Sequence, residues 1–247
     1  MSDPTRPRLD AAELAALDKK TEAAVALLER IAREHAPAAL ASSLGAEDMV
    51  LTDLIARHAP SIDLFVLDTG RLHEETYALI ARVEAHYGLR LQLFAPQAED
   101  VEAFVAHYGI NGFYDSLEAR LACCNARKVR PLARALAGKR AWITGMRREQ
   151  SPTRSDLSPE QWDEAHGLAK FNPLADWSAR DVWAYLRHHG VPFHPLHERF
   201  YPSIGCAPCT RAVAAGEDPR AGRWWWEQPE HKECGLHRRP VLTGETR

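Results

Sequence analysis

Apolar residues recur along the chain with two distinct periods. Between residues 10 and 34 they fall at helical spacing, which predicts a long amphipathic helix that packs against a core. The run at residues 64–67 is instead continuous and apolar, as expected of a strand that is buried on both faces. Further short strands are predicted at residues 38–42, 89–94 and 142–144.

Helices are predicted between these strands and after them. They cover about residues 47–58, 74–87 and 101–107, and a later helix starts at a capping-box-like pair, Ser178 and Asp181. Strands that alternate with helices imply an α/β fold, in which helices cover both faces of a parallel sheet.

Three loops directly follow predicted strands, at Ser43, Asp68 and Gly145. The carboxyl ends of parallel strands lie at one edge of a sheet, and open α/β sheets bind their ligands there. We therefore expect the three loops to converge on a single crevice.

The loop at residues 42–48 joins a strand to a helix. Unpaired backbone amides and the helix dipole favour an anion at such a position, and Gly45 would let the backbone approach it closely. The loop lacks the P-loop pattern and its lysine, so an ordinary strand-to-helix turn is the simpler explanation of this loop alone. Arg147 and Arg148 add cations suited to phosphate or sulfate oxygens, unless they belong to a solvated surface cluster.

The composition of the 247 residues is that of an ordinary globular protein, with 45% hydrophobic and 26% charged residues. The 31 basic residues are balanced by 34 acidic ones, so no excess of positive charge favours binding to nucleic acid. No apolar run approaches the roughly 20 residues that span a bilayer, and the first residues lack the apolar core of a signal peptide. We therefore expect a cytoplasmic protein that binds neither nucleic acid nor membrane.

Four of the five cysteines form two close pairs. Cys123 and Cys124 are adjacent, and Cys206 and Cys209 form a C-x-x-C pair. An odd number of cysteines without an export signal argues against a disulfide framework. Four thiolates can hold zinc or an iron–sulfur cluster, and the spacing favours a cluster only slightly. Inert thiols in a core are the alternative interpretation.

The fifth cysteine, Cys234, is close to the C-terminus and is a candidate nucleophile. Lys232 and His237 are near it in the sequence, and positive charge beside a thiol favours the reactive thiolate. Twenty-five residues separate it from Cys209, enough to reach at most about 80 Å at roughly 3.3 Å per residue. An incidental cysteine in an exposed tail is the alternative.

The sequence closely resembles the assimilatory sulfonucleotide reductases, specifically the iron–sulfur branch that reduces adenosine 5'-phosphosulfate. The matching stretches cover most of the chain in a specific order and are residues 43–48, 67–70, 123–128, 145–151, 201–210 and 233–237. This resemblance implies an adenine-nucleotide α-hydrolase-like α/β sheet, in agreement with the predicted alternation of strands and helices.

The resemblance also implies a reaction and a cofactor. In this family a cysteine of the C-terminal tail, matched by Cys234, attacks the sulfur of the substrate and AMP leaves. Thioredoxin then resolves the resulting S-sulfocysteine and releases sulfite. A 4Fe-4S cluster is expected on the four paired cysteines, which are Cys123, Cys124, Cys206 and Cys209.

Further residues receive roles from the same resemblance. A thiolate that approaches a sulfate meets electrostatic repulsion, which preorganised cations must offset. The catalytic set expected beside Cys234 consists of His237, Lys128, Arg220 and Arg223. The residues expected to cradle the nucleotide are Ser42, Ser43, Leu44, Gly45, Thr69, Gly70 and Arg147.

We expect three segments: an N-terminal helical segment at residues 1–36, an α/β nucleotide-binding domain at 37–202, and a cluster-binding segment with a catalytic tail at 203–247. The sequence permits a homo-oligomer without specifying one. The main alternative is a reductase of 3'-phosphoadenosine 5'-phosphosulfate, although relatives specialised for that substrate generally lack the two cysteine pairs.

Two more distant alternatives are a tRNA-thiolating enzyme and a redox sensor. An ATP-dependent tRNA-thiolating enzyme on the same sheet would need a Ser-Gly-Gly-x-Asp-Ser loop and a basic face for RNA, and neither is evident in the sequence. A nucleotide-binding iron–sulfur sensor would use the same cysteines without releasing sulfite. Sulfite release therefore separates the enzyme from the sensor.

Overall fold

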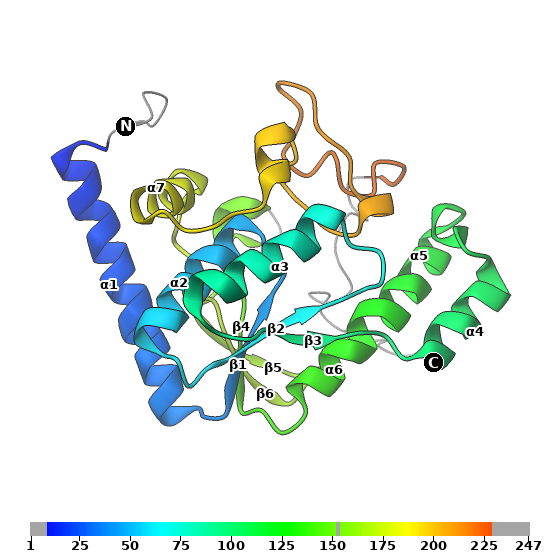
Figure 1. Cartoon of the computed structure of the whole chain (residues 1–247), viewed down its shortest axis with the longest axis horizontal. Helices are drawn as coiled ribbons and strands as arrows, with labels where there is room; N and C mark the ends of the chain where they lie inside the picture. Colours follow the sequence, from blue (N-terminus) through cyan, green and yellow to red (C-terminus); the bar gives the residue numbers. More distant parts are fainter. Residues whose placement is uncertain (1–8, 152–153, 229–247) are drawn as a thin grey trace, which may run out of the picture.

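The computed structural model describes residues 9–151 and 154–228. Its centre is a six-stranded sheet in the order β3-β2-β1-β4-β6-β5 (Figure 1). The strands are β1 (Ala38–Ser42), β2 (Asp63–Leu67), β3 (Gln92–Phe94), β4 (Ala141–Ile143), β5 (Glu160–Asp163) and β6 (Leu168–Phe171). All neighbouring strands run parallel except β5, which pairs antiparallel with β6 at the edge. The expected α/β fold with a parallel sheet is confirmed, with one antiparallel strand added.

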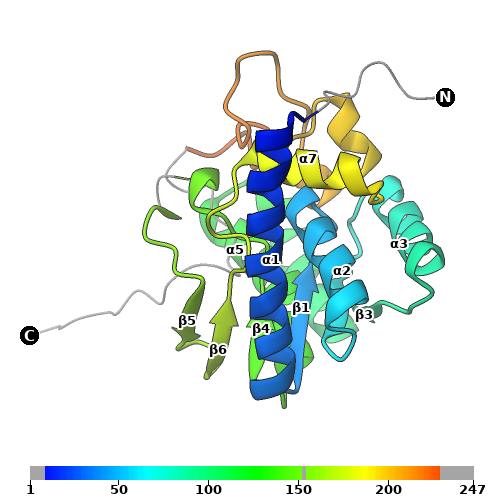
Figure 2. The same cartoon turned by 90° about the vertical axis from the view of Figure 1, so that its left-hand side faces the viewer.

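Helices cover both faces of this sheet. One face packs against α1 (Ala11–Glu34), α2 (Ala46–His58), α3 (Glu74–Tyr87) and α7 (Ala179–His189). Figure 2 looks onto α1, with α2 and α7 beside it. The opposite face packs against α6 (Arg130–Leu136), which buries Leu132 and Leu136 against Phe65 and Trp142. Successive strand residues point to opposite faces, so continuous apolar strands supply both cores.

The remaining helices lie beside the sheet. These are α4 (Ala98–Tyr108) and α5 (Leu117–Cys124), on the right in Figure 1. The Ser116 hydroxyl caps α5 by accepting a hydrogen bond from the amide of Ala119. A π-helical turn at Asn125–Val129 joins α5 to α6, and such wide turns are frequent at functional sites. The vicinal cysteines therefore end one helix immediately before an irregular turn.

Most predicted elements are present, with shifted ends. The strand expected at residues 89–94 is only the three residues of β3, and the helix expected from residue 101 starts at Ala98. The hairpin of β5 and β6 was not predicted from the sequence. Strand β5 has the sequence Glu-Gln-Trp-Asp, in which the only apolar side chain, Trp162, is exposed, so this strand carries no buried-strand pattern.

The segment after residue 202 contains only short turns among its described residues, yet it packs onto the domain. The side chain of Trp224 is 1% exposed, and Thr210 forms a β-bridge with Arg223. Within the described part of the chain, no helix is both long and apolar enough to cross a membrane.

Candidate active site

A cleft of about 990 Å³ opens at the carboxyl edge of the sheet. Its walls include Ser43 after β1, Thr69 after β2 and Gly145 after β4. The three loops therefore converge on a single cleft, as the sequence predicts. Other walls come from α7 and from residues 213–220, which carry Arg220.

The loop after β1 holds a buried carboxylate. Both the amide and the hydroxyl of Ser43 donate hydrogen bonds of 2.6 Å to Oδ2 of Asp48. Burial raises the pKa of Asp48 to about 6, although these two hydrogen bonds oppose the shift. A Cβ on Gly145 would lie 2.4 Å from Oδ1 of Asp48, so only glycine allows the two loops to pack this closely. The loop is thus fixed by the protein's own hydrogen bonds to Asp48.

Not all residues of the predicted nucleotide cradle line the cleft. Ser42, Ser43, Gly45, Thr69 and Arg147 do so. Leu44, at φ +58°, places its side chain in the hydrophobic core. Gly70, at φ +65°, is not among the lining residues and lies against the Arg127 guanidinium.

Arg147 is held rigidly in the cleft wall. Its side chain is 7% exposed and forms ion pairs with Glu47 at 2.8 Å and Glu149 at 2.9 Å. It also donates to the carbonyl oxygen of Trp177 at 3.2 Å. Two carboxylates therefore balance and orient this guanidinium.

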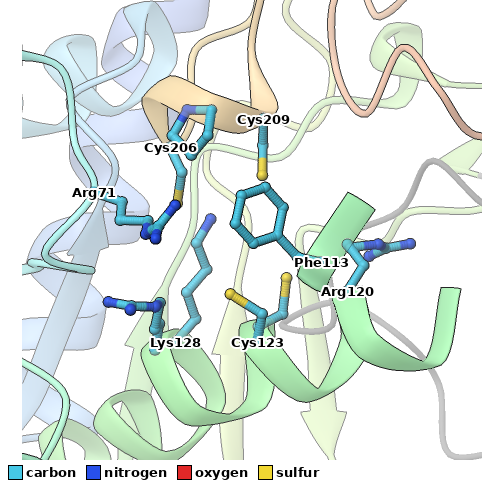
Figure 3. A pocket seen from close by; sticks show the side chains of 10 residues that line it. Arg71, Phe113, Arg120, Cys123, Lys128, Cys206 and Cys209 are labelled. Carbon is cyan, nitrogen blue, oxygen red and sulfur yellow. The ribbon is translucent and has the colours of Figure 1, made fainter. Parts of the chain in front are cut away.

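A second, smaller cavity contains the four paired cysteines (Figure 3). Cys123 and Cys124 come from the end of α5, and Cys206 and Cys209 from a short 3-10 turn at Ala207–Cys209. The other lining residues are Arg71, Phe113, Arg120, Arg127, Lys128 and Pro208. All four cysteines are free thiols. No group of three or more His, Cys, Asp or Glu side chains within the described ranges is arranged to hold a single metal ion.

Burial and nearby positive charge act in opposite directions on the pKa values of the thiols in this cavity. Burial and the neighbouring Cys206 raise the pKa of Cys209 to about 12. Burial also raises the pKa of Cys206, yet Lys128, a hydrogen bond with Thr69 and the charges of Arg223 and Arg127 together outweigh it and lower the pKa of that thiol below its ordinary value. Burial thus outweighs the nearby cations at Cys209 and at Cys123, whose pKa is also raised, whereas the opposing interactions prevail at Cys206.

The lining of the cavity fits a metal–sulfur cluster that is held by the four cysteines. Metal ligation requires deprotonated thiols, and the surrounding cations compensate the charge of four thiolates. The buried Nε of Arg127 has no hydrogen-bond partner among the described residues, although this side chain lines the cavity. A cluster that exposes sulfur acceptors would satisfy such a donor.

Lys128 lines both the cysteine cavity and the large cleft. It lies in the π-helical turn four residues after Cys124, and Figure 3 shows its side chain extending toward the turn that carries Cys206. This lysine is the physical connection between the two cavities.

The two arginines predicted to be catalytic also line the cleft. Arg223 is buried, with its guanidinium carbon 4.5 Å from the centre of the Trp224 ring and Nη1 3.5 Å from the Ser203 hydroxyl. A Cβ on Gly205 would lie 2.3 Å from Nη2 of Arg223, so this glycine makes room for the guanidinium. The remaining predicted catalytic residues, Cys234 and His237, lie outside the described residues.

Sequence reasoning missed most of the cationic wall of the cysteine cavity, namely Arg71, Arg120 and Arg127. A signal for two of them was present. Arg120 precedes Cys124 by four residues and Arg127 follows Cys123 by four, the spacing that places side chains on one face of a helix.

Residues 37–212 match the model of the phosphoadenosine phosphosulfate reductase domain. The adenosine 5'-phosphosulfate reductase of Allochromatium vinosum is 58% identical over 223 residues, covering 90% of this chain and 87% of that relative. The enzyme of the same name from Burkholderia cepacia is 56% identical over 91% of this chain and 89% of that relative.

Solved structures agree on the fold. The phosphoadenylyl-sulfate reductase of Candida auris, in complex with phosphate, superposes with a TM-score of 0.65 at 26% identity, over 84% of this chain and 99% of that one. Yeast FAD synthetase in complex with FAD superposes with a TM-score of 0.54 at 14% identity, over 84% of this chain and 70% of that one. The second likeness shows the shared fold alone.

Proposed function

The chain belongs to the phosphoadenosine phosphosulfate reductase domain family, and we propose that it is an enzyme that reduces adenosine 5'-phosphosulfate to sulfite and AMP in sulfate assimilation. The relatives from Allochromatium vinosum and Burkholderia cepacia, which match nearly the whole chain, carry the name of this activity. The observation that carries the proposal is the position of Lys128, which joins a nucleotide-sized cleft to a cavity of four cysteines.

In this proposal the cleft binds the nucleotide. The cleft volume is within the range of small-molecule sites, and its floor lies at the strand ends where α/β sheets bind nucleotides. Ser43, Thr69 and Arg147 are positioned to contact the substrate. The internal hydrogen bonds of Asp48 and the ion pairs of Arg147 fix these groups in advance, which reduces the entropic cost of binding.

We assign a 4Fe-4S cluster to Cys123, Cys124, Cys206 and Cys209, as the resemblance implies. Support comes from the shared cavity, its cationic lining and the unpartnered Nε of Arg127. When bound, the cluster would supply a fixed charge and hold the two cysteine segments together. It need not change oxidation state, since a dithiol delivers both electrons of the reaction.

The chemical steps belong to Cys234 and to thioredoxin. The Cys234 thiolate attacks the sulfate sulfur, a new S–S bond forms, and the bond from sulfur to the phosphate oxygen breaks so that AMP leaves. A thioredoxin thiolate then attacks the sulfur of Cys234, releases sulfite and forms a mixed disulfide. The second thioredoxin thiol attacks that mixed disulfide, which closes the thioredoxin disulfide and frees the Cys234 thiolate. Lys128, Arg220 and Arg223 offset the repulsion between thiolate and sulfate in the first step.

Sulfite release tests the proposal directly. Anaerobically purified protein should release sulfite from adenosine 5'-phosphosulfate in the presence of reduced thioredoxin, and kcat/KM should be higher than for the 3'-phosphorylated substrate. The acidic pair Glu47 and Asp48 at the cleft offers nothing to an additional phosphate. A preference for the 3'-phosphorylated nucleotide would assign the chain to the other substrate class, and nucleotide binding without sulfite would favour a sensor.

A further inference from the structure

A buried ion pair lies behind the cysteine cavity. Arg120 is fully buried on α5, and Glu227 is only 7% exposed on the segment that leads to the C-terminus. Nε of Arg120 donates to Oε1 of Glu227 and Nη2 donates to Oε2, both at 2.8 Å. This bidentate geometry is the strong form of a carboxylate–guanidinium contact. The ion pair joins residues that are 107 positions apart in the sequence.

Arg120 also contacts the cysteine site itself. Its side chain lines the cavity and is hydrogen-bonded to the thiol of Cys124, one helical turn further along α5. Its guanidinium carbon lies 4.7 Å from the centre of the Trp224 ring. One guanidinium therefore touches a proposed cluster ligand on one side and the final described segment on the other.

That final segment is tied to the second cysteine pair as well. The amide of Trp224 donates to the carbonyl oxygen of Cys209 at 3.1 Å, and the amide of Glu227 donates to the carbonyl oxygen of Trp224 at 2.8 Å. Residues 224–227 thus form a turn that rests on both cysteine-bearing segments. Cys234 follows Glu227 by seven residues, and a chain of that length spans at most about 25 Å at roughly 3.5 Å per residue.

We propose that Arg120 and Glu227 are positioning residues that anchor the base of the C-terminal segment to the four-cysteine site, so that the filled site and the placement of Cys234 stabilise each other. The inference rests on the cluster assigned above. The physical reason is that a fully buried guanidinium needs an anionic partner, which the carboxylate of Glu227 supplies, while the same side chain lines the cavity that would hold the cluster. Such a coupling acts in both directions.

The test compares the wild-type holoenzyme with Glu227→Gln, which removes the charge and keeps the shape. The matched control is Glu160→Gln, which breaks an exposed pair with Arg30 on the distant edge of the sheet. We expect Glu227→Gln to lower kcat at least 10-fold while KM for the nucleotide stays within twofold. Cluster loss to an iron chelator, followed by visible absorbance, should be at least fivefold faster. Glu227→Asp should recover part of both effects.

Tryptic cleavage after the basic residues of the C-terminal segment gives a readout that does not need activity. Cleavage should be faster in Glu227→Gln and in cluster-free wild type than in the wild-type holoenzyme. Equal cleavage rates and equal rates of cluster loss would overturn the anchor. Iron content and sulfite release of the wild type are measured first. Absence of iron or of sulfite release would contradict the proposed function. A normal wild type together with a Glu227→Gln variant that behaves like it would contradict only this inference. If Glu227→Gln does not fold, the comparison of cluster-free and holo wild type decides.

Discussion

Lys128 owes its position to an irregular turn. A regular α-helix running on from α5 would place a residue four positions after Cys124 directly above that cysteine, on the same helix face. The π-helical turn at Asn125–Val129 widens the backbone there, and the lysine borders the cleft as well as the cysteine cavity. A single wide turn therefore gives one cation access to two sites.

Replacing Lys128 by alanine should lower kcat/KM for adenosine 5'-phosphosulfate by about 10²-fold, because a charge aimed at the reacting group is typically worth that much or more. Steady-state sulfite production measures it. Lys19→Ala, an exposed lysine on α1, is the control and should leave kcat/KM unchanged. A Lys128→Ala enzyme within twofold of wild type would remove the lysine from the proposed mechanism.

The raised pKa of Asp48 predicts that the stability of the folded protein depends on pH. Its pKa of about 6 in the folded protein exceeds the ordinary 3.8, so the folded state retains a proton that the unfolded chain releases. The free energy of unfolding should therefore fall as pH rises from about 4 to 6, by about 3 kcal/mol at most from this group. The side chain of Asp48→Asn cannot titrate, so the denaturant midpoint of this variant should not show the part of the pH dependence that comes from Asp48. Parallel pH profiles for the two proteins would contradict the assignment.

At the scale of elements, the sequence predicts the segments that have a regular periodicity. The buried strands β1, β2 and β4 and the long helices were expected near their observed positions because their apolar patterns are regular. Strand β5 and the π-helical turn were missed, since an edge strand buries little and a π turn has no periodic signature.

The candidate site was also predicted from the sequence only in part. The pairing of cysteines from two distant segments was expected from the family resemblance, and their shared cavity is observed. The arginines around them were not predicted, because an arginine on a helix is interpreted as a solvated charge until tertiary contacts bury it. Arg120 is the extreme case, with no exposed surface.

The four cysteines of the cavity come from the end of α5 and from the turn at Ala207–Cys209 with the residue before it. Anaerobically purified protein should contain about four irons per chain, because four thiolates ligate one 4Fe-4S cluster. Cys206→Ser should lose most of this iron and most of the activity. Metal and sulfide analysis measures both proteins, and stoichiometric zinc without iron in the wild type would refute the cluster.

At the scale of the whole molecule, the described residues form the proposed substrate and cluster sites, whereas the proposed nucleophile lies elsewhere in the chain. The cleft, the cationic wall and the cysteine cavity are built by residues 41–224, whereas Cys234 belongs to the C-terminal segment outside the described residues. Substrate binding and covalent chemistry should therefore be separable by a single substitution.

Cys234→Ser provides that separation. A serine hydroxyl is a far weaker nucleophile than a thiolate and has no evident base here, so covalent attack should stop while nucleotide binding and iron content stay at wild-type levels. With wild-type protein, substrate and no thioredoxin, one AMP per chain should be released and the protein should gain the mass of an SO₃ group on Cys234. Thioredoxin should then discharge this adduct as sulfite. Intact-mass analysis and AMP quantification measure these steps. Normal turnover by the serine variant, or an adduct on another cysteine, would refute the mechanism even in a protein that reduces the nucleotide.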